Sequence, residues 1–161
     1  MAGRAPVRPP QHREAVMAKV ATYLNFAGQT EEAFGFYGRV FGTAPTRPPM
    51  RYGDLPAAAD QPPLPEDVKP LILHLELPIL GGHLLMGSDA VAGFGPPLVP
   101  GNTFSIMLQT DDRAQTDRLF AALSEGGTVS MPLQDMFWGD YYGMCTDRFG
   151  VQWMLDCPPQ G

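Results

Sequence analysis

The feature that most constrains what this chain can fold into is an internal repeat. Two predicted helices, each following a predicted strand, carry apolar residues at matching places, and the matched positions are 83 residues apart throughout. A single shift that aligns a strand and the helix after it indicates a duplicated structural unit. The aligned pairs are Leu24 with Met107, Phe36 with Leu119, Tyr37 with Phe120 and Val40 with Leu123.

The two halves of the chain show the same order of predicted elements, a strand, a helix and three more strands. Runs of β-branched and aromatic residues predict the strands, and apolar residues at helical spacing predict the helices. In the first half the strands cover 20–26, 44–52, 71–77 and 83–86, and the helix is capped by Thr30 and closed by Gly42. In the second half the strands cover 103–109, 128–133, 141–146 and 151–155, and the helix is capped by Asp111 or Asp112.

This order predicts an α+β fold in which two βαβββ modules form a cupped mixed sheet flanked by helices. Neither half offers a core that closes alone, so both belong to a single domain over 19–158, with module one at 19–97 and module two at 98–158. A Pro- and Gly-rich stretch, 87–101, links the modules. Residues 1–18 are rich in Pro and Arg with little apolar content, which predicts a flexible N-terminal tail.

Composition argues against several classes of protein. The 161 residues suit one ordinary domain, and 44% hydrophobic with 17% charged residues is typical of a globular chain. With only 11 Lys and Arg against 17 Asp and Glu, nucleic acid is not an expected partner. No apolar run approaches the roughly 20 residues that cross a bilayer, and the N-terminus lacks a secretory hydrophobic stretch. Cys145 and Cys157 fit no metal or redox motif, so reduced thiols and a cytoplasmic location are predicted. Without a long apolar run, no membrane partner is expected.

Three segments resemble a known superfamily. They are YLNFAGQTEEAFGFYGRVFG, ILHLELPILGGHLLMGSD and LFAALSEGGTVSMPLQDMFWGDYYGMCTDRFGVQWML, within a resemblance that covers about residues 20–157. They are similar to the vicinal oxygen chelate superfamily of glyoxalase, bleomycin-resistance and dioxygenase proteins, and more closely to its PhnB-like branch, also described as demethylubiquinone-methyltransferase-like. The resemblance implies the fold but not an activity, because the superfamily includes isomerases, dioxygenases, antibiotic-modifying enzymes and drug-sequestering binders.

Metal-using members of this superfamily hold one divalent ion through inward-facing His, Gln or Glu side chains from both modules. On this chain the resemblance places Ala21 or Thr22, His74, Ser105 and Met154 at those positions. Only His74 is a good ligand, because a hydroxyl is a weak donor and a thioether suits soft rather than hard ions. The resemblance therefore implies no bound metal, and no cofactor is expected.

His74 is also the candidate catalytic residue. A single histidine in an apolar strand is usually a hydrogen-bonded core or pocket residue, with acid–base and metal-binding roles as alternatives. Aromatic and amide groups gather near Gly139, as in small-ligand pockets, although Phe137 and Trp138 can equally fill the core or a dimer interface. The residues predicted to bind a ligand are His74, Met86, Gln134, Phe137, Trp138, Tyr141 and Met154.

Together these patterns predict a small-molecule-binding protein of the glyoxalase/bleomycin-resistance fold, without a bound metal and with a ligand that the sequence does not identify. The resemblance also implies a homodimer, because members of this fold commonly pair modules across a two-fold axis. The alternative is an enzyme of the same superfamily. It would be a lyase, isomerase or dioxygenase that uses either a metal or His74.

Overall fold

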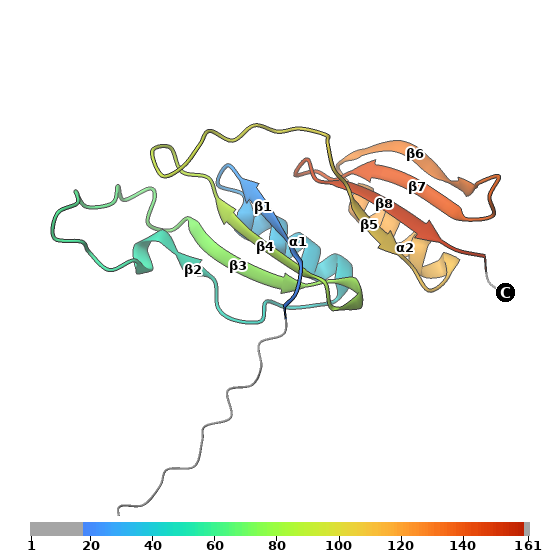
Figure 1. Ribbon diagram of the computed structural model, residues 1–161, viewed down its shortest axis with the longest axis horizontal. Coiled ribbons are helices and arrows are strands. Elements are labelled where there is room, and N and C mark those ends of the chain that lie inside the picture. Colours follow the sequence, from blue (N-terminus) through green and yellow to red (C-terminus); the bar gives the residue numbers. More distant parts are fainter. Residues whose placement is uncertain (1–17, 160–161) are drawn as a thin grey trace, which may run out of the picture.

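The computed structural model describes residues 18–159, which form two βαβββ modules joined by a long connection (Figure 1). The predicted tail lies outside the described residues, apart from Ala18. Module one contains β1 (Ala21–Phe26), α1 (Thr30–Phe41), β2 (Met50–Arg51), β3 (Ile72–Pro78) and β4 (Leu84–Asp89). Module two contains β5 (Ile106–Gln109), α2 (Arg113–Ser124), β6 (Thr128–Asp135), β7 (Tyr141–Thr146) and β8 (Gln152–Cys157).

Each module builds one four-stranded mixed sheet with the same strand order. The orders are β1-β4-β3-β2 and β5-β8-β7-β6, and in each sheet the first strand pairs in parallel with the last strand of the module. Figure 1 shows α1 and α2 on the same side of the sheets, behind them in this view. We call the side of each sheet turned away from its helix the open face. The duplicated α+β architecture confirms the prediction, with the eight strands arranged as two sheets of four.

The core lies between the sheets and their helices. In β1, Leu24 and Phe26 are buried while Tyr23 and Asn25 are exposed, the alternation expected of a strand with one covered face. The open face therefore keeps side chains that the core does not use. The helical part of the core consists of Ala33, Phe34, Phe36, Tyr37 and Val40 from α1 and Thr116, Leu119, Phe120 and Leu123 from α2.

The 83-residue repeat holds for the helices but not for the strands. The aligned helical pairs are all buried. Leu24, however, is buried in β1, whereas its predicted counterpart Met107 is 54% exposed in β5, where Ile106 and Leu108 are the buried residues. Strand side chains alternate between faces, so a shift of one residue moves a position to the opposite side of the sheet. The alignment of Leu24 with Met107 was therefore wrong by one residue.

Two predicted strands are shorter in the structure. The strand expected over 44–52 is reduced to Met50–Arg51, because the residues before it include Pro45, Pro48 and Pro49, which have no N–H to donate to a neighbouring strand. The strand expected to begin at residue 103 begins at Ile106. None of the helices among residues 18–159 has the length and apolar character needed to cross a membrane.

The helix ends follow the sequence signals with one exception. Asp112 caps α2 by accepting a hydrogen bond from the Gln115 amide, and Gly42 ends α1 in the left-handed conformation with φ of 67°. Thr30 does not cap α1, because it is the first helical residue and is fully buried. Its amide and hydroxyl donate to Asp89 Oδ1 at 3.0 and 2.6 Å, which ties the start of α1 to the end of β4.

A buried carboxylate, Asp147, joins the two modules. Its Oδ2 accepts hydrogen bonds from the Tyr37 hydroxyl at 2.7 Å and from Trp153 Nε1 at 2.8 Å. Its Oδ1 accepts from the amides of Phe149 at 2.8 Å and Val151 at 3.1 Å. Burial raises the pKa of Tyr37, and the Asp147 charge acts in the same direction. Since Tyr37 belongs to module one and the other groups to module two, polar as well as apolar contacts fix how the modules pack.

Candidate functional site

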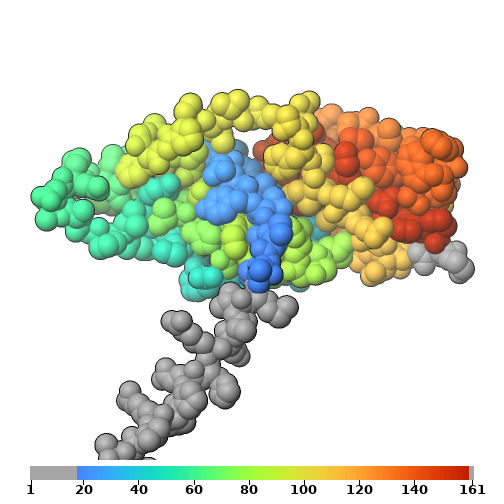
Figure 2. Space-filling view, viewed as in Figure 1, coloured from blue at the N-terminus to red at the C-terminus, as the bar shows by residue number. Residues whose placement is uncertain are grey.

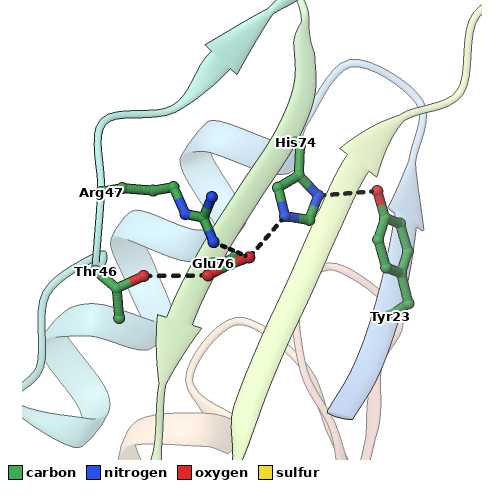
Figure 3. A network of polar contacts seen from close by, with 5 residues as sticks. All are labelled: Tyr23, Thr46, Arg47, His74 and Glu76. Atoms are coloured by element: carbon green, nitrogen blue, oxygen red, sulfur yellow. Dashed lines mark hydrogen bonds and ion pairs between the residues drawn. The ribbon is translucent and has the colours of Figure 1, made fainter. Parts of the chain in front are cut away.

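The open face of module one carries a network of polar contacts around His74 and Glu76 of β3 (Figure 3). His74 Nε2 lies 3.0 Å from Glu76 Oε1, and His74 Nδ1 lies 3.4 Å from the Tyr23 hydroxyl. On the other side of the carboxylate, Arg47 donates to Oε1 at 2.9 Å and Thr46 donates to Oε2 at 3.2 Å. The network thus joins two strands and the segment that precedes β2.

Strand geometry explains why these side chains meet. His74 and Glu76 are two residues apart in β3 and so point to the same side of the sheet. The register aligns Tyr23 of β1 with Met86 of β4, and Met86 with Glu76, so all three share the open face. Figure 3 shows His74 reaching across β4 to Tyr23, whose ring lies 5.9 Å from the imidazole, centroid to centroid, at an interplanar angle of 30°. The two rings form a surface that is both aromatic and polar.

Glu76 determines which nitrogen of His74 carries a proton. An ionised carboxylate only accepts hydrogen bonds, so Nε2 must hold the hydrogen directed at Oε1. In the neutral ring Nδ1 is then an acceptor, and it faces the Tyr23 hydroxyl. The hydrogen bond from His74 holds the pKa of Glu76 below its ordinary value, and Arg47 and Thr46 act in the same direction against the opposing effect of burial. A buried anion therefore orients an imidazole whose acceptor nitrogen faces the Tyr23 hydroxyl on the open face.

We expect Glu76→Gln to remove an acid-sensitive part of the stability. Because the folded-state pKa of Glu76 is lowered, the stability from its carboxylate is present above the ordinary glutamate pKa and is lost as the pH falls through the lowered value. Urea unfolding at pH 7 should show a loss of about 1–2 kcal/mol, and the further loss on acidification to pH 3 should be smaller than in the wild type. The exposed Glu32→Gln serves as the control. An equal acid-induced loss in the wild type and Glu76→Gln would contradict this assignment.

The open face of module two carries two rows of side chains that cross all four strands. Directly paired residues point to the same side of a sheet, so each row follows from the strand register. The thioether row consists of Met107, Met154, Met144 and Met131, taken in the order β5, β8, β7, β6. The polar row lies one step further along and consists of Gln109, Asp156, Tyr142 and Gln134.

Asp156 in the polar row has an unusual environment. Burial raises its pKa, and the nearby carboxyl of Asp140 acts in the same direction, whereas a weak hydrogen bond from Gln109 at 3.5 Å opposes the shift. Asp140 also accepts a hydrogen bond from Trp138 Nε1 at 2.9 Å. The Trp138 ring lies 6.4 Å from the ring of Tyr142, centroid to centroid. Two carboxyl groups, an indole and a phenol thus meet beside the two middle residues of the polar row, Asp156 and Tyr142.

The structure divides the predicted ligand-binding residues between several places. His74 and Met86 share the open face of module one, while Met154 and Gln134 share that of module two. Trp138 and Phe137 lie in the turn between β6 and β7, and Phe137 is 97% exposed.

Tyr141 lies on the opposite side of β7 from its neighbour Tyr142. Its hydroxyl donates to Asp117 of α2 at 2.7 Å, and the Arg113 guanidinium lies 4.4 Å from the centre of its ring. The structure therefore does not bring Tyr141 together with the other predicted residues. Tyr142, which was not among the predicted ligand-binding residues, lies on the open face with Asp156 and Gln134.

Of the positions that the resemblance marks for metal ligands, only His74 carries a good ligand for a divalent ion. Thr22 alternates with Tyr23 and therefore points to the covered side of β1, as Leu24 does. Its hydroxyl lies 2.9 Å from His83 Nε2. Met154 belongs to the thioether row, and the two nitrogens of His74 face Glu76 and Tyr23. Within the part of the chain that the structure describes, no three His, Cys, Asp or Glu side chains form a group that could hold a metal ion.

Two hollows lie between the modules. One, of about 340 Å³, separates the β3–β4 hairpin from β5 and is lined by residues that include Thr22, His83, Met107 and Gln109. The other, of about 420 Å³, lies where the connection at 98–101 passes β1 and the turn before β8. Figure 2 shows this connection, in yellow, arching above the blue β1 with an opening beneath it. Because Met107 and Gln109 begin the two rows, the first hollow leads onto the open face of module two.

A βαβββ module and its repeat, each with one helix on one side of a mixed sheet, are the architecture of the glyoxalase-like fold. Solved glyoxalase/bleomycin resistance/dioxygenase proteins share the fold, with TM-scores of 0.60 and 0.53 at sequence identities of 11% and 15%. The sequence profile of the family described as 3-demethylubiquinone-9 3-methyltransferase matches residues 18–155. The chain belongs to this PhnB-like family, which confirms the resemblance found in the sequence.

Individual relatives cover nearly the whole chain. Protein YjdN of Escherichia coli K12 is 30% identical over 146 residues, which is 88% of this chain and 96% of YjdN. The crystal structure of protein PA1353 from Pseudomonas aeruginosa has a TM-score of 0.74 at 38% identity, covering 89% of this chain and all of that one. A putative 3-demethylubiquinone-9 3-methyltransferase, PhnB protein, from Bacillus cereus has a TM-score of 0.66 at 24% identity, covering 87% and 99%.

Proposed function

We propose that this protein binds a small organic molecule on the open face of module one, against His74 and Tyr23, without a divalent metal. The observation that carries the proposal is the near-parallel His74–Tyr23 pair, which combines an aromatic surface with a fixed acceptor nitrogen. Small-ligand sites are built from apolar surface and a few well-placed polar groups. Glu76 holds the imidazole in one orientation before any ligand arrives, which lowers the entropic cost of binding.

The neighbouring side chains support the same proposal. Met86 lies between Tyr23 and Glu76 in the register, and its flexible thioether can adapt to the shape of a ligand. Tyr23 itself is 47% exposed, so part of its surface is available for contact. The methyltransferase activity in the family description is not part of the proposal, because the sequence contains no Gly-rich nucleotide-binding fingerprint.

The second candidate function is an enzyme that moves a proton in a lyase or isomerase reaction. One observation favours it, the 3.0 Å contact between Glu76 and His74, since a carboxylate that orients an imidazole is a common arrangement for a general base. In that role His74 Nδ1 would accept the proton of a bound substrate while Glu76 stabilises the resulting imidazolium. Activity lost in both His74→Gln and Glu76→Gln, with ligand binding retained, would place this function first.

We also propose that the protein is a homodimer. Large apolar side chains are exposed on the connection between the modules, among them Leu98, Val99 and Phe104. Contact with a second copy of the chain would remove such surfaces from water. Light scattering at micromolar concentration should give about 35 kDa, twice the chain mass of 17.5 kDa. A mass close to 17.5 kDa under the same conditions would contradict the dimer.

The binding proposal is tested with fragments that combine an aromatic ring with a hydroxyl or amide N–H. Fragments of this class should stack on the rings and donate to His74 Nδ1 in place of the Tyr23 hydroxyl, whose contact with that nitrogen is long at 3.4 Å. In saturation-transfer NMR and calorimetry, His74→Ala should weaken their binding by about tenfold, which corresponds to roughly 1.4 kcal/mol for one lost hydrogen bond and ring contact. His83→Ala is the matched control, because His83 instead contacts Thr22. Equal binding by His74→Ala and the wild type would refute the proposed site.

A further inference from the structure

The thioether row of module two is a chemically distinctive surface that the proposed function does not use. Four of the nine methionines in the chain stand on this one row, each on a different strand of the sheet. Neighbouring strands lie about 4.8 Å apart, so each sulfur is within reach of the next through flexible side chains. Met107 is 54% exposed, and Met131, Met144 and Met154 are partly exposed, so the row is accessible from the open face.

We propose that the thioether row binds a soft monovalent cation, Cu(I), through the sulfur atoms of Met154 and its neighbours. Thioethers are soft donors that select Cu(I) over hard divalent ions. Met154 stands next to both Met107 and Met144, so three sulfur atoms from adjacent strands can converge above β8. The inference is independent of the ligand proposed at His74, which lies on the other module.

The charges around the row favour a cation. Neither the thioether row nor the polar row beside it contains a Lys, Arg or His. The polar row instead supplies Asp156, with the carboxyl of Asp140 close by. Like charges would repel an approaching cation, whereas these carboxyl groups attract it and offset part of the cost of removing it from water. The row thus combines soft donors with a negative surrounding.

The two cysteines do not account for this site. Cys145 pairs with Trp153, and Cys157 follows Leu155 by two residues, which places both on the covered side of the sheet. Both thiols are buried. A cation on the open face therefore meets thioethers first, and the two sets of sulfur ligands lie on opposite sides of the same strands.

The test uses the full-length chain with Ag(I) as a redox-inert probe and with Cu(I) under anaerobic conditions against a chromophoric Cu(I) chelator. We expect one ion per chain and an X-ray absorption spectrum whose first shell is sulfur. Met154→Leu and Met144→Leu should each weaken binding by at least about tenfold, since even the loss of an indirect partner of a metal ligand has that effect. These substitutions conserve volume and cost less than about 1.5 kcal/mol, so the variants should fold.

Two control variants distinguish binding at the thioether row from binding at other sulfur atoms of the chain. Met50→Leu changes an exposed methionine of module one and should bind both ions as the wild type does. The Cys145→Ala/Cys157→Ala double variant should also retain binding. The proposal is overturned if the wild type binds no more tightly than Met144→Leu/Met154→Leu, or if binding disappears with the cysteines while the methionine variants keep it.

Discussion

Replacing Asp147 with alanine should lower the melting temperature by roughly 10 °C, the largest effect we expect from a single polar substitution in this chain. The change removes the acceptor of both the Tyr37 hydroxyl and Trp153 Nε1, and neither residue has measurable exposure to water. A buried donor left without a partner costs about 1–3 kcal/mol, so the two together give about 4 kcal/mol. Two backbone amides also lose their acceptor.

Two comparison variants identify the cause of this loss. Asp60→Ala changes an exposed aspartate in the loop before β3 and should alter the stability by less than about 0.5 kcal/mol. Tyr37→Phe removes one donor while Asp147 keeps the other three, so it should cost less than Asp147→Ala. Chemical unfolding provides the measurement. If Asp147→Ala were as stable as Asp60→Ala, the carboxylate would not join the modules as described.

Gly127→Ala should be destabilising by about 3 kcal/mol, at the upper end of what overpacking costs, and should lower the melting temperature by roughly 6–12 °C. A Cβ at this position would lie 2.1 Å from the backbone oxygen of Thr146 and 2.9 Å from the backbone of Asp147. Those atoms belong to the neighbouring strand and the turn after it, so they cannot move aside as the end of a side chain can. The strand pairing of Thr128 with Thr146 would have to open.

The matched control for this effect is Gly101→Ala. No atom lies within 4 Å of a Cβ placed there, and its φ is not in the left-handed region. Its melting temperature should be unchanged or slightly raised, because alanine restricts the unfolded chain more than glycine does. A melting temperature for Gly127→Ala within 2 °C of this control would contradict the close approach of the two strands, because 3 kcal/mol should give at least about 6 °C.

Local patterns were sufficient to predict the order of the elements and the repeat in the helices. The apolar side chains of α1 and of α2 recur with the helical period and so line one side of each helix, and in both helices that side is buried. The same offset failed for Leu24 and Met107, because in a strand a difference of one residue exchanges the covered and open faces. The 44–52 segment looked extended, yet its prolines leave only two residues that pair with β3.

The site was harder to predict because its parts come from distant segments. His74 was named a candidate by its residue type. Tyr23 meets His74 only through the strand order, and Arg47 meets Glu76 only through the path of a loop. Glu76 had a visible signal, since a charged residue two positions after His74 in an apolar strand must share its face. Tyr141 and Tyr142 are adjacent in β7 and point to opposite faces of the sheet, and the sequence alone did not show which of them points to the open face. The thioether row became visible only from the register of four strands.

Native mass spectrometry of the full-length chain, purified in the presence of a divalent-metal chelator, tests most directly whether an organic molecule occupies the open face at His74. We predict that each chain retains an organic compound that survives the chelator, that this mass is absent from His74→Ala, and that it remains in His83→Ala. The contradictory result is a mass increase equal to one divalent metal ion per chain, lost with the chelator and in His74→Ala. That outcome would replace the metal-free binding site with a metal centre.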